Sequence, residues 1–261
     1  MENVTKLFNQ ATIQKVVAAR GIDTTKLPTK EELDHQTIDR ANAGVIANRK
    51  RYYYRMSVWS GGVPLRFSFN DWQVDKQPNQ AKARELGNQA FKLARQLETN
   101  QFNVALAGGP GVGKTSLALA IMYQLMGVGQ TAMFVSTAEL LRLVNEKYDA
   151  PDVRERLNYV LKDMKKVDVL VLDDFGTEGG KPTEKGFYKP VHKDLRTLMY
   201  DVANARWNLN INDGKLATII TTNNTRSQLE NMYSGQTIDR LYTKDTSCQL
   251  LFDNMEGVRS V

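Results

Sequence analysis

The sequence predicts an α/β fold, in which a parallel sheet is covered by helices on both faces and follows a smaller, mainly helical region. From about residue 81 onward, short apolar runs alternate with amphipathic stretches. The runs are almost continuously apolar, as in strands that are buried on both faces. Before residue 60 the chain is polar and has no sustained β pattern. We therefore expect a helical region over 1–60, a linker over 61–80 and the α/β domain over 81–261.

Two stretches of the amino-terminal region have helical features. VTKLFNQATIQKVVAARG is a candidate helix that would end at Gly21, and PTKEELDHQTIDRANAGVIANRK is a second. Thr29 and Glu32 have the spacing of a capping box, which satisfies free backbone N–H groups of the first helical turn. The segments SGGVPLRF and DKQPNQ then supply the glycine and proline residues that are typical of a linker.

The α/β domain has several runs that favour strands, with helical stretches between them. The strand candidates are NVALA, TAMFV, VDVLVL, ATIIT and CQLLF. Among the helical stretches, AKARELGNQAFKLARQLE places apolar residues such as Leu86, Leu93 and Leu97 on one face. Parallel strands bring their carboxyl ends to one edge of the sheet, so we expect the ligand there.

The composition is that of an ordinary globular chain and argues against several classes of protein. The 261 residues are 41% hydrophobic and 25% charged, and no apolar run approaches the ~18 residues that cross a bilayer. The polar start, MENVTKLFNQ, does not resemble a signal peptide, and the single cysteine, Cys248, excludes an internal disulfide and a cysteine-rich zinc module. A reducing cytoplasm fits, without a membrane partner. The net charge of +6 permits nucleic-acid binding but is equally that of a solvated surface.

The stretch GGPGVGKTS follows the first strand candidate and precedes the helical stretch LALAIMYQLM. It fits the phosphate-binding pattern G-x-x-x-x-G-K-[ST] of a P-loop. Glycines let backbone N–H groups point at phosphates, Lys114 would reach the β and γ phosphates, and Thr115 would bind Mg²⁺. The residues expected to bind the nucleotide are Gly108, Gly109, Pro110, Gly111, Val112, Gly113, Lys114, Thr115 and Ser116.

The stretch VDVLVLDDF would supply the second half of the site. A buried strand that ends in Asp173 has the Walker B arrangement, in which the carboxylate holds Mg²⁺ through water. Asp174 would orient or deprotonate the attacking water; alternatively, it caps a turn before Gly176. Paired acids at a strand end favour the catalytic role. The short aspartate side chain favours slow hydrolysis, which suits a switch.

Three further residues are candidates for the reaction. Asn223 follows the strand candidate in LATIITTNN, where its amide would bind the γ-phosphate or the lytic water, although asparagine after a strand is also a common turn former. Arg240 in QTIDRLYTKD and Arg259 in EGVRSV would stabilise charge on the transferred phosphoryl group, or are ordinary surface arginines. No N-K-x-D motif for guanine is present, and no lid or acceptor motif of a small kinase is recognisable. We therefore expect ATP and Mg²⁺ as ligands.

From about Gly62 to Ser260, the order of these elements resembles the AAA+ domain of bacterial replicative helicase loaders of the DnaC/DnaI type. The resemblance is carried by GGVPLRFSFNDWQV before the domain, LVLDDFG as Walker B, IITTNN as sensor 1, IDRL as the arginine finger and GVRS as sensor 2. It implies an AAA+ P-loop fold with strand order 5-1-4-3-2, catalytic roles for Arg240 and Arg259, and self-association through that domain. The implied partners are a DnaB-type ring helicase and single-stranded DNA. The zinc-binding cysteines of the DnaI branch are absent from 1–60, so what this region binds stays open.

Two stretches combine aromatic residues, which stack on bases, with basic residues, which bind phosphates. NRKRYYYRMSVW surrounds Tyr52, Tyr53 and Tyr54 with arginine and lysine; alternatively, its tyrosines pack on the ATPase core. GGKPTEKGFYKPVHK follows Walker B and is a candidate contact to single-stranded DNA, or an exposed surface loop. Its candidate contact residues are Lys181, Lys185, Tyr188 and Lys189.

The function expected from these features is delivery of a ring helicase onto single-stranded DNA in replication initiation, with ATP binding and hydrolysis switching assembly and release. Residues 1–60 would dock the helicase. One alternative is an IstB-type transposition helper ATPase that acts on duplex DNA. Another is an ATP-binding adaptor with negligible hydrolysis. A phage or another mobile element as the source would account for a shared motor with a different docking region.

Overall fold

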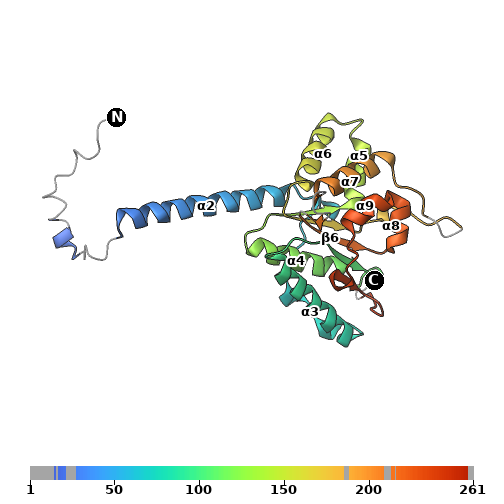
Figure 1. Ribbon diagram of the computed structural model, residues 1–261, viewed down its shortest axis with the longest axis horizontal. Helices are drawn as coiled ribbons and strands as arrows, with labels where there is room; N and C mark the ends of the chain where they lie inside the picture. Colours follow the sequence, from blue (N-terminus) through green and yellow to red (C-terminus); the bar gives the residue numbers. More distant parts are fainter. Residues whose placement is uncertain are drawn as a thin grey trace. The chain divides into compact units, whose positions relative to one another are not determined.

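The computed structural model describes residues 15, 17–21, 28–184, 188–208, 213–214 and 216–257 (Figure 1). The chain divides into two compact units, Met1–Ile46 and Ala47–Val261. No helix in these described ranges is long and apolar enough to span a membrane. The second unit contains the sheet and all the candidate site residues that the structure describes.

The helix predicted from PTKEELDH onward is present as α2, Lys30–Arg55. Its capping box is formed, because the Thr29 N–H donates to Glu32 Oε2 (2.7 Å) and the Glu32 N–H donates to Thr29 Oγ1 (3.2 Å). Acidic residues in the first turn and Arg55 in the last turn match the helix dipole. The helix predicted before Gly21 lies mostly outside the described residues.

The second unit is built on a parallel sheet in the order β2-β3-β6-β1-β7. Its strands coincide with the predicted apolar runs: β1 Val104–Ala107, β2 Ala132–Ser136, β3 Val169–Asp173, β6 Ala217–Thr222 and β7 Gln249–Leu251. Numbered along the chain, these strands have the order 5-1-4-3-2 from one edge, so the expected fold is confirmed. The sequence did not indicate the short antiparallel pair β4 Trp207–Asn208 and β5 Asp213–Gly214.

Helices cover both faces of the sheet, and alternate strand residues face the two layers. On one face α3 and α4 pack over β1 residues Val104 and Leu106. On the other face the remaining helices pack over Ala105. The helices of the second unit after α2 are α3 Gln80–Leu97, α4 Lys114–Gly127, α5 Thr137–Glu146, α6 Pro151–Met164, α7 Lys193–Ala205, α8 Arg226–Tyr233 and α9 Gly235–Leu241.

The outer edge of β2 is covered by the residues that follow α2. Val58 pairs in parallel with Val135, and its N–H donates to Phe134 O (2.7 Å). The Trp59 ring stacks on the Phe134 ring, with centroids 4.4 Å apart and planes 9° from parallel. The residues after α2 therefore complete the sheet rather than merely leading into it.

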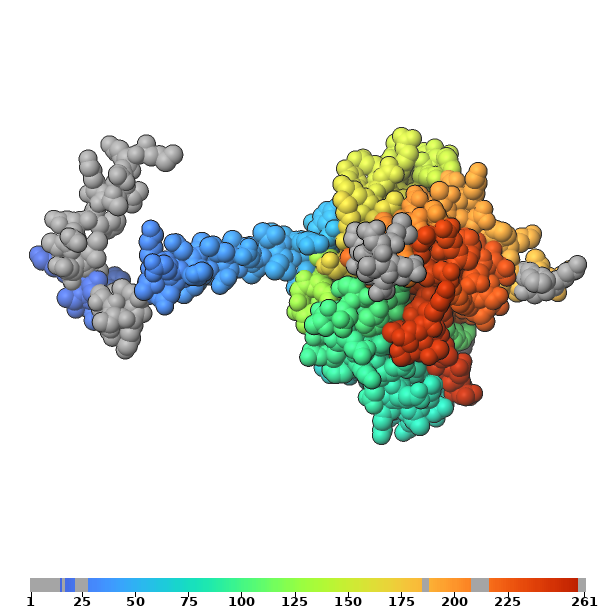
Figure 2. Space-filling view, in the orientation of Figure 1, coloured from blue at the N-terminus to red at the C-terminus, as the bar shows by residue number. Residues whose placement is uncertain are grey.

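Residues 61–80, which the sequence predicts as a linker, belong to the second unit. They include the 3-10 turns η4 Phe69–Asp71 and η5 Val74–Lys76, and the Trp72 indole N–H donates to Ala83 O of α3 (2.9 Å). Helix α3 also contacts β7, because the Gln89 amide donates to Gln249 O (3.1 Å). The helix and this carboxyl-terminal segment lie side by side in Figure 2. These contacts join α3 to the segment before it and to β7.

Candidate nucleotide-binding site

The predicted P-loop connects β1 to α4, as expected from the sequence. Gly111 (φ 78°) and Gly113 (φ 97°) have left-handed backbone conformations, which residues with a Cβ rarely adopt. A Cβ on Gly113 would also lie 2.7 Å from Cζ3 of Trp72, so the indole closes one side of the loop. Val112 points into the core beneath the loop. The loop shape therefore depends on both its glycines and its packing partner Trp72.

Lys114 connects the P-loop to the end of β6. Its side chain is buried, and its ammonium group donates to Gly108 O (2.9 Å), Gly109 O (2.5 Å) and Asn223 Oδ1 (2.6 Å). Asn223 comes from a strand adjacent to β1, which explains how a distant residue reaches the loop. The structure thus brings together the P-loop lysine and the predicted sensor asparagine.

Asp173 lies beneath Thr115 at the end of β3. Its Oδ1 accepts hydrogen bonds from Thr115 Oγ1 (2.9 Å) and Thr221 Oγ1 (2.7 Å). Burial raises the pKa of this carboxyl, the two threonine hydroxyls oppose that rise, and the neighbouring Asp174 charge adds to it. A carboxylate beside a hydroxyl offers the oxygen ligands that Mg²⁺ prefers, so Asp173 and Thr115 fit the predicted metal role.

Asp174 follows on the same strand end but faces outward. It has a positive φ of 53°, and its N–H donates to Thr221 Oγ1 (2.9 Å), which fixes the turn. Its side chain is exposed beside the P-loop. A hollow of about 220 Å³ is lined by Pro110, Gly111, Gly113, Lys114, Thr115, Ser116, Asp174 and Asn223. Phosphate-binding and candidate water-activating groups therefore share one cleft.

Behind this cleft lies a carboxylate that sequence reasoning missed. Glu178, in the 3-10 turn η6 Thr177–Gly179, accepts hydrogen bonds from Thr137 Oγ1 (2.7 Å), the Gly176 N–H (3.0 Å) and the Tyr233 hydroxyl. Burial raises the pKa of Glu178, and the Asp174 charge contributes to that rise. The sequence signal was an acid shortly after the paired aspartates, which alone does not distinguish it from a surface residue.

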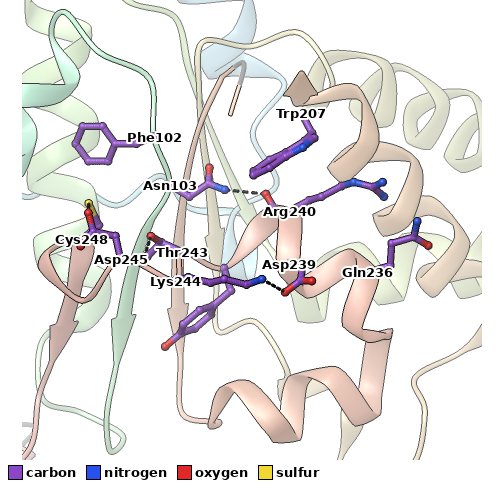
Figure 3. A pocket seen from close by; sticks show the side chains of 11 residues that line it. Phe102, Asn103, Trp207, Gln236, Asp239, Arg240, Thr243, Lys244, Asp245 and Cys248 are labelled. Atoms are coloured by element: carbon purple, nitrogen blue, oxygen red, sulfur yellow. Dashed lines mark hydrogen bonds and ion pairs between the residues drawn. The ribbon is translucent and has the colours of Figure 1, made fainter. Parts of the chain in front are cut away.

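Arg240 does not line the phosphate cleft of its own chain. It lies on α9, where its guanidinium group donates to Asn204 Oδ1 and lies 5.8 Å from the centroid of the Tyr200 ring. Its backbone oxygen accepts a hydrogen bond from Nδ2 of Asn103, the residue just before β1 (2.8 Å; Figure 3). A separate hollow of about 530 Å³ surrounds Arg240 at the amino ends of β1 and β7, away from the phosphate cleft. Arg259 lies outside the described residues.

The predicted DNA-contact stretch after Walker B is only partly described. Lys181 and Lys189 are exposed, whereas Lys185 lies outside the described residues. Tyr188 is half-buried and packs against the core of the sheet. Its ring is therefore less available for stacking on a base than the sequence suggested.

Comparison with known proteins agrees with the fold and with ATP binding. A family model described as "IstB-like ATP binding protein" matches residues 23–242. The chain is 36% identical over 133 residues to the uncharacterized protein YdaV of Escherichia coli K12, a match that covers 50% of this chain and 51% of YdaV. It is 27% identical over 191 residues to the replicative helicase loader DnaC of E. coli K12, covering 71% of this chain and 74% of DnaC.

A solved structure gives the same architecture. The crystal structure of DnaI has a TM-score of 0.51 with 20% sequence identity, covering 76% of this chain and 95% of that one. At this identity the similarity shows the fold alone. Together with the DnaC match, it confirms the resemblance to AAA+ loaders of the DnaC/DnaI type.

Proposed function

Because the chain belongs to the family of IstB-like ATP-binding proteins, we propose that it is an ATPase that loads a DnaB-type ring helicase onto single-stranded DNA. In this proposal, ATP binding and slow hydrolysis switch assembly and release during replication initiation. The convergence of Lys114, Asp174 and Asn223 in one cleft supports the ATPase part, as does the hydrogen bond from Thr115 of that cleft to Asp173. The similarity to DnaC along most of both chains supports the loader part.

ATP binding would use groups that already converge in the cleft. The backbone N–H groups at the start of α4 and the ammonium group of Lys114 would bind the phosphates. Lys114 would exchange its bonds to Gly108 O and Gly109 O for phosphate oxygens, while staying close to Asn223. Thr115 and Asp173 would hold Mg²⁺, which neutralises phosphate charge when it is bound.

Hydrolysis would place water between Asp174 and the γ-phosphate. The exposed carboxylate of Asp174 would accept a proton from the attacking water, and the Asn223 amide would orient either that water or the phosphate. Lys114 is the cation among the described residues that line the cleft. Additional positive charge for the transition state would come from Arg240 of a neighbouring copy, so the proposal includes self-association.

Capture of a helicase tests the proposal most directly. Full-length protein would be immobilised and mixed with a purified DnaB-type helicase, with and without ATP, and Lys114→Ala would serve as the matched variant. We expect capture by the wild-type protein that responds to ATP, and no response to ATP in the variant. Absence of helicase capture in both nucleotide conditions would contradict the loader function.

A transposition helper is the second candidate, because the matched family is described as IstB-like. It would act on duplex DNA beside a transposase rather than on single strands beside a helicase. The same immobilised protein, mixed with a transposase and duplex DNA, distinguishes the two candidates. Capture of the transposase but not the helicase would support the second.

A further inference from the structure

We propose that the last turns of α2, together with Arg66 and Tyr123, form a contact surface for a single-stranded nucleic acid, separate from the loop after β3. A hollow of about 400 Å³ lies there, and its lining comes from α2, from the segment before α3 and from the end of α4. The lining residues are Ala47, Lys50, Arg51, Tyr54, Arg66, Tyr123 and Met126. All of them belong to the second unit.

A second hollow adjoins the first across Arg51. It has a volume of about 440 Å³ and is lined by Asn48, Arg51, Tyr52, Arg55 and Met56. Figure 2 shows the light-blue end of α2 next to the green end of α4, where the first hollow lies. The two hollows therefore lie on either side of Arg51 at the end of α2.

The charged side chains given as lining the two hollows are all positive. The nearest acid that the described residues show is Asp163, which is buried and forms a hydrogen bond with the Tyr52 side chain. Arg51, Arg55 and Arg66 are exposed and form no ion pair within the described ranges. By contrast, Arg142 and Arg226 of the second unit each pair with two carboxylates. Unpaired guanidinium groups in a row suit the phosphates of a nucleic-acid backbone.

The aromatic side chains are held in place. Tyr123 donates its hydroxyl proton to Leu65 O (2.7 Å), so Tyr54 is the donor in the 3.0 Å contact between the two hydroxyls. This chain of hydrogen bonds also fixes the backbone next to Arg66. Lys50 donates to Met126 O (3.0 Å) and holds the end of α2 against the end of α4. The surface is therefore organised before any ligand arrives, which reduces the entropy lost on binding.

Exposed rings favour a single strand over a duplex. The Tyr52 side chain is 46% exposed, and its neighbour Tyr53 is buried, so Tyr52 presents ring surface beside Arg51 and Arg55. Unpaired bases stack on such rings, whereas a duplex keeps its bases stacked inside. The inference rests on the proposed function only in taking a nucleic acid as the partner.

Binding of fluorescein-labelled oligothymidine to the full-length protein, followed by fluorescence anisotropy, tests the charge of the surface. The double variant Arg51→Ala/Arg66→Ala removes two cations from it. Arg84→Ala/Lys92→Ala removes two exposed cations of α3 and is the matched control. We expect the first variant to bind roughly tenfold more weakly, and the slope of log affinity against log salt concentration to become shallower by about two. The control should change little in either respect. Equal affinities of the two variants would overturn the proposal.

The aromatic part has its own test with the same probe. Tyr52→Ala should weaken binding severalfold and Tyr52→Phe should not, since a phenylalanine ring keeps the stacking face. Competition with unlabelled duplex and with heparin, a polyanion without bases, should be clearly weaker than competition with unlabelled oligothymidine. Equal competition by heparin would mean a general anion surface and would overturn the assignment.

ATP hydrolysis by each variant separates this inference from the proposed function. ATP hydrolysis should stay at the wild-type level, because none of the substituted residues lines the nucleotide cleft. Loss of oligonucleotide binding with normal ATPase activity supports the surface assignment. Normal oligonucleotide binding by the Arg51→Ala/Arg66→Ala variant overturns it, whether or not the protein captures a helicase.

Discussion

The hydroxyl of Thr137 lies 2.7 Å from Oε2 of Glu178, directly behind the two aspartates that end β3. The same hydroxyl is 3.1 Å from Asp174 O. Thr137 thus connects a buried carboxylate to the backbone of the residue expected to activate water. Because Asp174 has a positive φ, which is unfavourable for a residue with a Cβ, its conformation depends on such neighbours.

Thr137→Val should lower the rate of ATP hydrolysis severalfold while ATP affinity changes little. Valine keeps the shape of the side chain but removes the hydroxyl that restrains Asp174. Steady-state kinetics and binding of a fluorescent ATP analogue would measure the two effects separately. Thr137→Ser is the control, because it keeps the hydroxyl and should restore the rate; a serine variant as slow as the valine variant would contradict this role.

Glu178→Gln should make stability less dependent on pH. The pKa of Glu178 is raised in the folded protein, mainly by burial. Its stabilising contribution is therefore complete below the pKa of the unfolded chain and is lost as pH rises through the folded-state pKa. The free energy of unfolding, measured with urea, should decline less for the variant than for the wild type as pH rises from mildly acidic to neutral. Glu155→Gln, on the exposed face of α6, is the control and should leave the decline unchanged.

Lys114→Ala should abolish ATP binding, whereas Asp174→Asn should keep binding and lose hydrolysis. The lysine contacts the phosphate loop directly, while Asp174 only lines the cleft. Binding of a fluorescent ATP analogue and phosphate release would be measured for both variants. Hydrolysis by Asp174→Asn at the wild-type rate would remove Asp174 from the mechanism.

Arg240 should act on the ATP of a neighbouring copy. It is held by Asn204 on α7, away from the cleft of its own chain. Arg240→Ala should therefore bind ATP normally and hydrolyse it much more slowly, at the lower end of the ~10³ to 10⁵ range measured for arginine fingers. Phosphate release per subunit should rise with protein concentration in the wild type.

Mixing two inactive variants provides the control for Arg240. Arg240→Ala keeps its P-loop and Lys114→Ala keeps its arginine, so a mixed assembly contains complete sites and should recover part of the activity. Co-purification of tagged and untagged copies would show that the variants assemble together. Inactive mixtures that do assemble would rule out action between subunits.

A chain that begins at Ala47 should fold, bind ATP and fail to capture helicase. This boundary keeps Val58 on the edge of β2 and Trp72 beside the P-loop. A chain that begins at residue 76 would lose both contacts and should unfold at lower urea concentration. Helicase capture by the Ala47 chain at the full-length level would contradict a docking role for the amino-terminal region.

The strands and the P-loop were predictable because their signals are local. The apolar run VDVLVL followed by two aspartates specifies a buried strand with a charged end, and the structure has β3 there. The order of the strands came from resemblance, since apolar runs carry no information about which strands are neighbours.

Other features depend on contacts between distant residues, which no local pattern encodes. Arg206 is buried and donates to Met164 O, Val167 O and Thr218 Oγ1, and burial lowers its pKa to about 9. In the sequence it is one of many arginines. Likewise, the approach of Trp72 to Gly113 depends on how the segment before α3 packs, so the glycine and proline residues around it suggested only a linker.

The position of β1 inside the sheet has a consequence for the newly made chain. Val104 pairs with Ile219 and Ala105 with Gln249, so both ladders of β1 must wait for residues synthesised much later. Pairing over such long loops is slow, because the entropy of closing the loop is lost before the ladder forms. The phosphate loop therefore acquires Asn223 only after β6 has been synthesised, and ATP can stabilise the nascent protein only after translation has passed that strand.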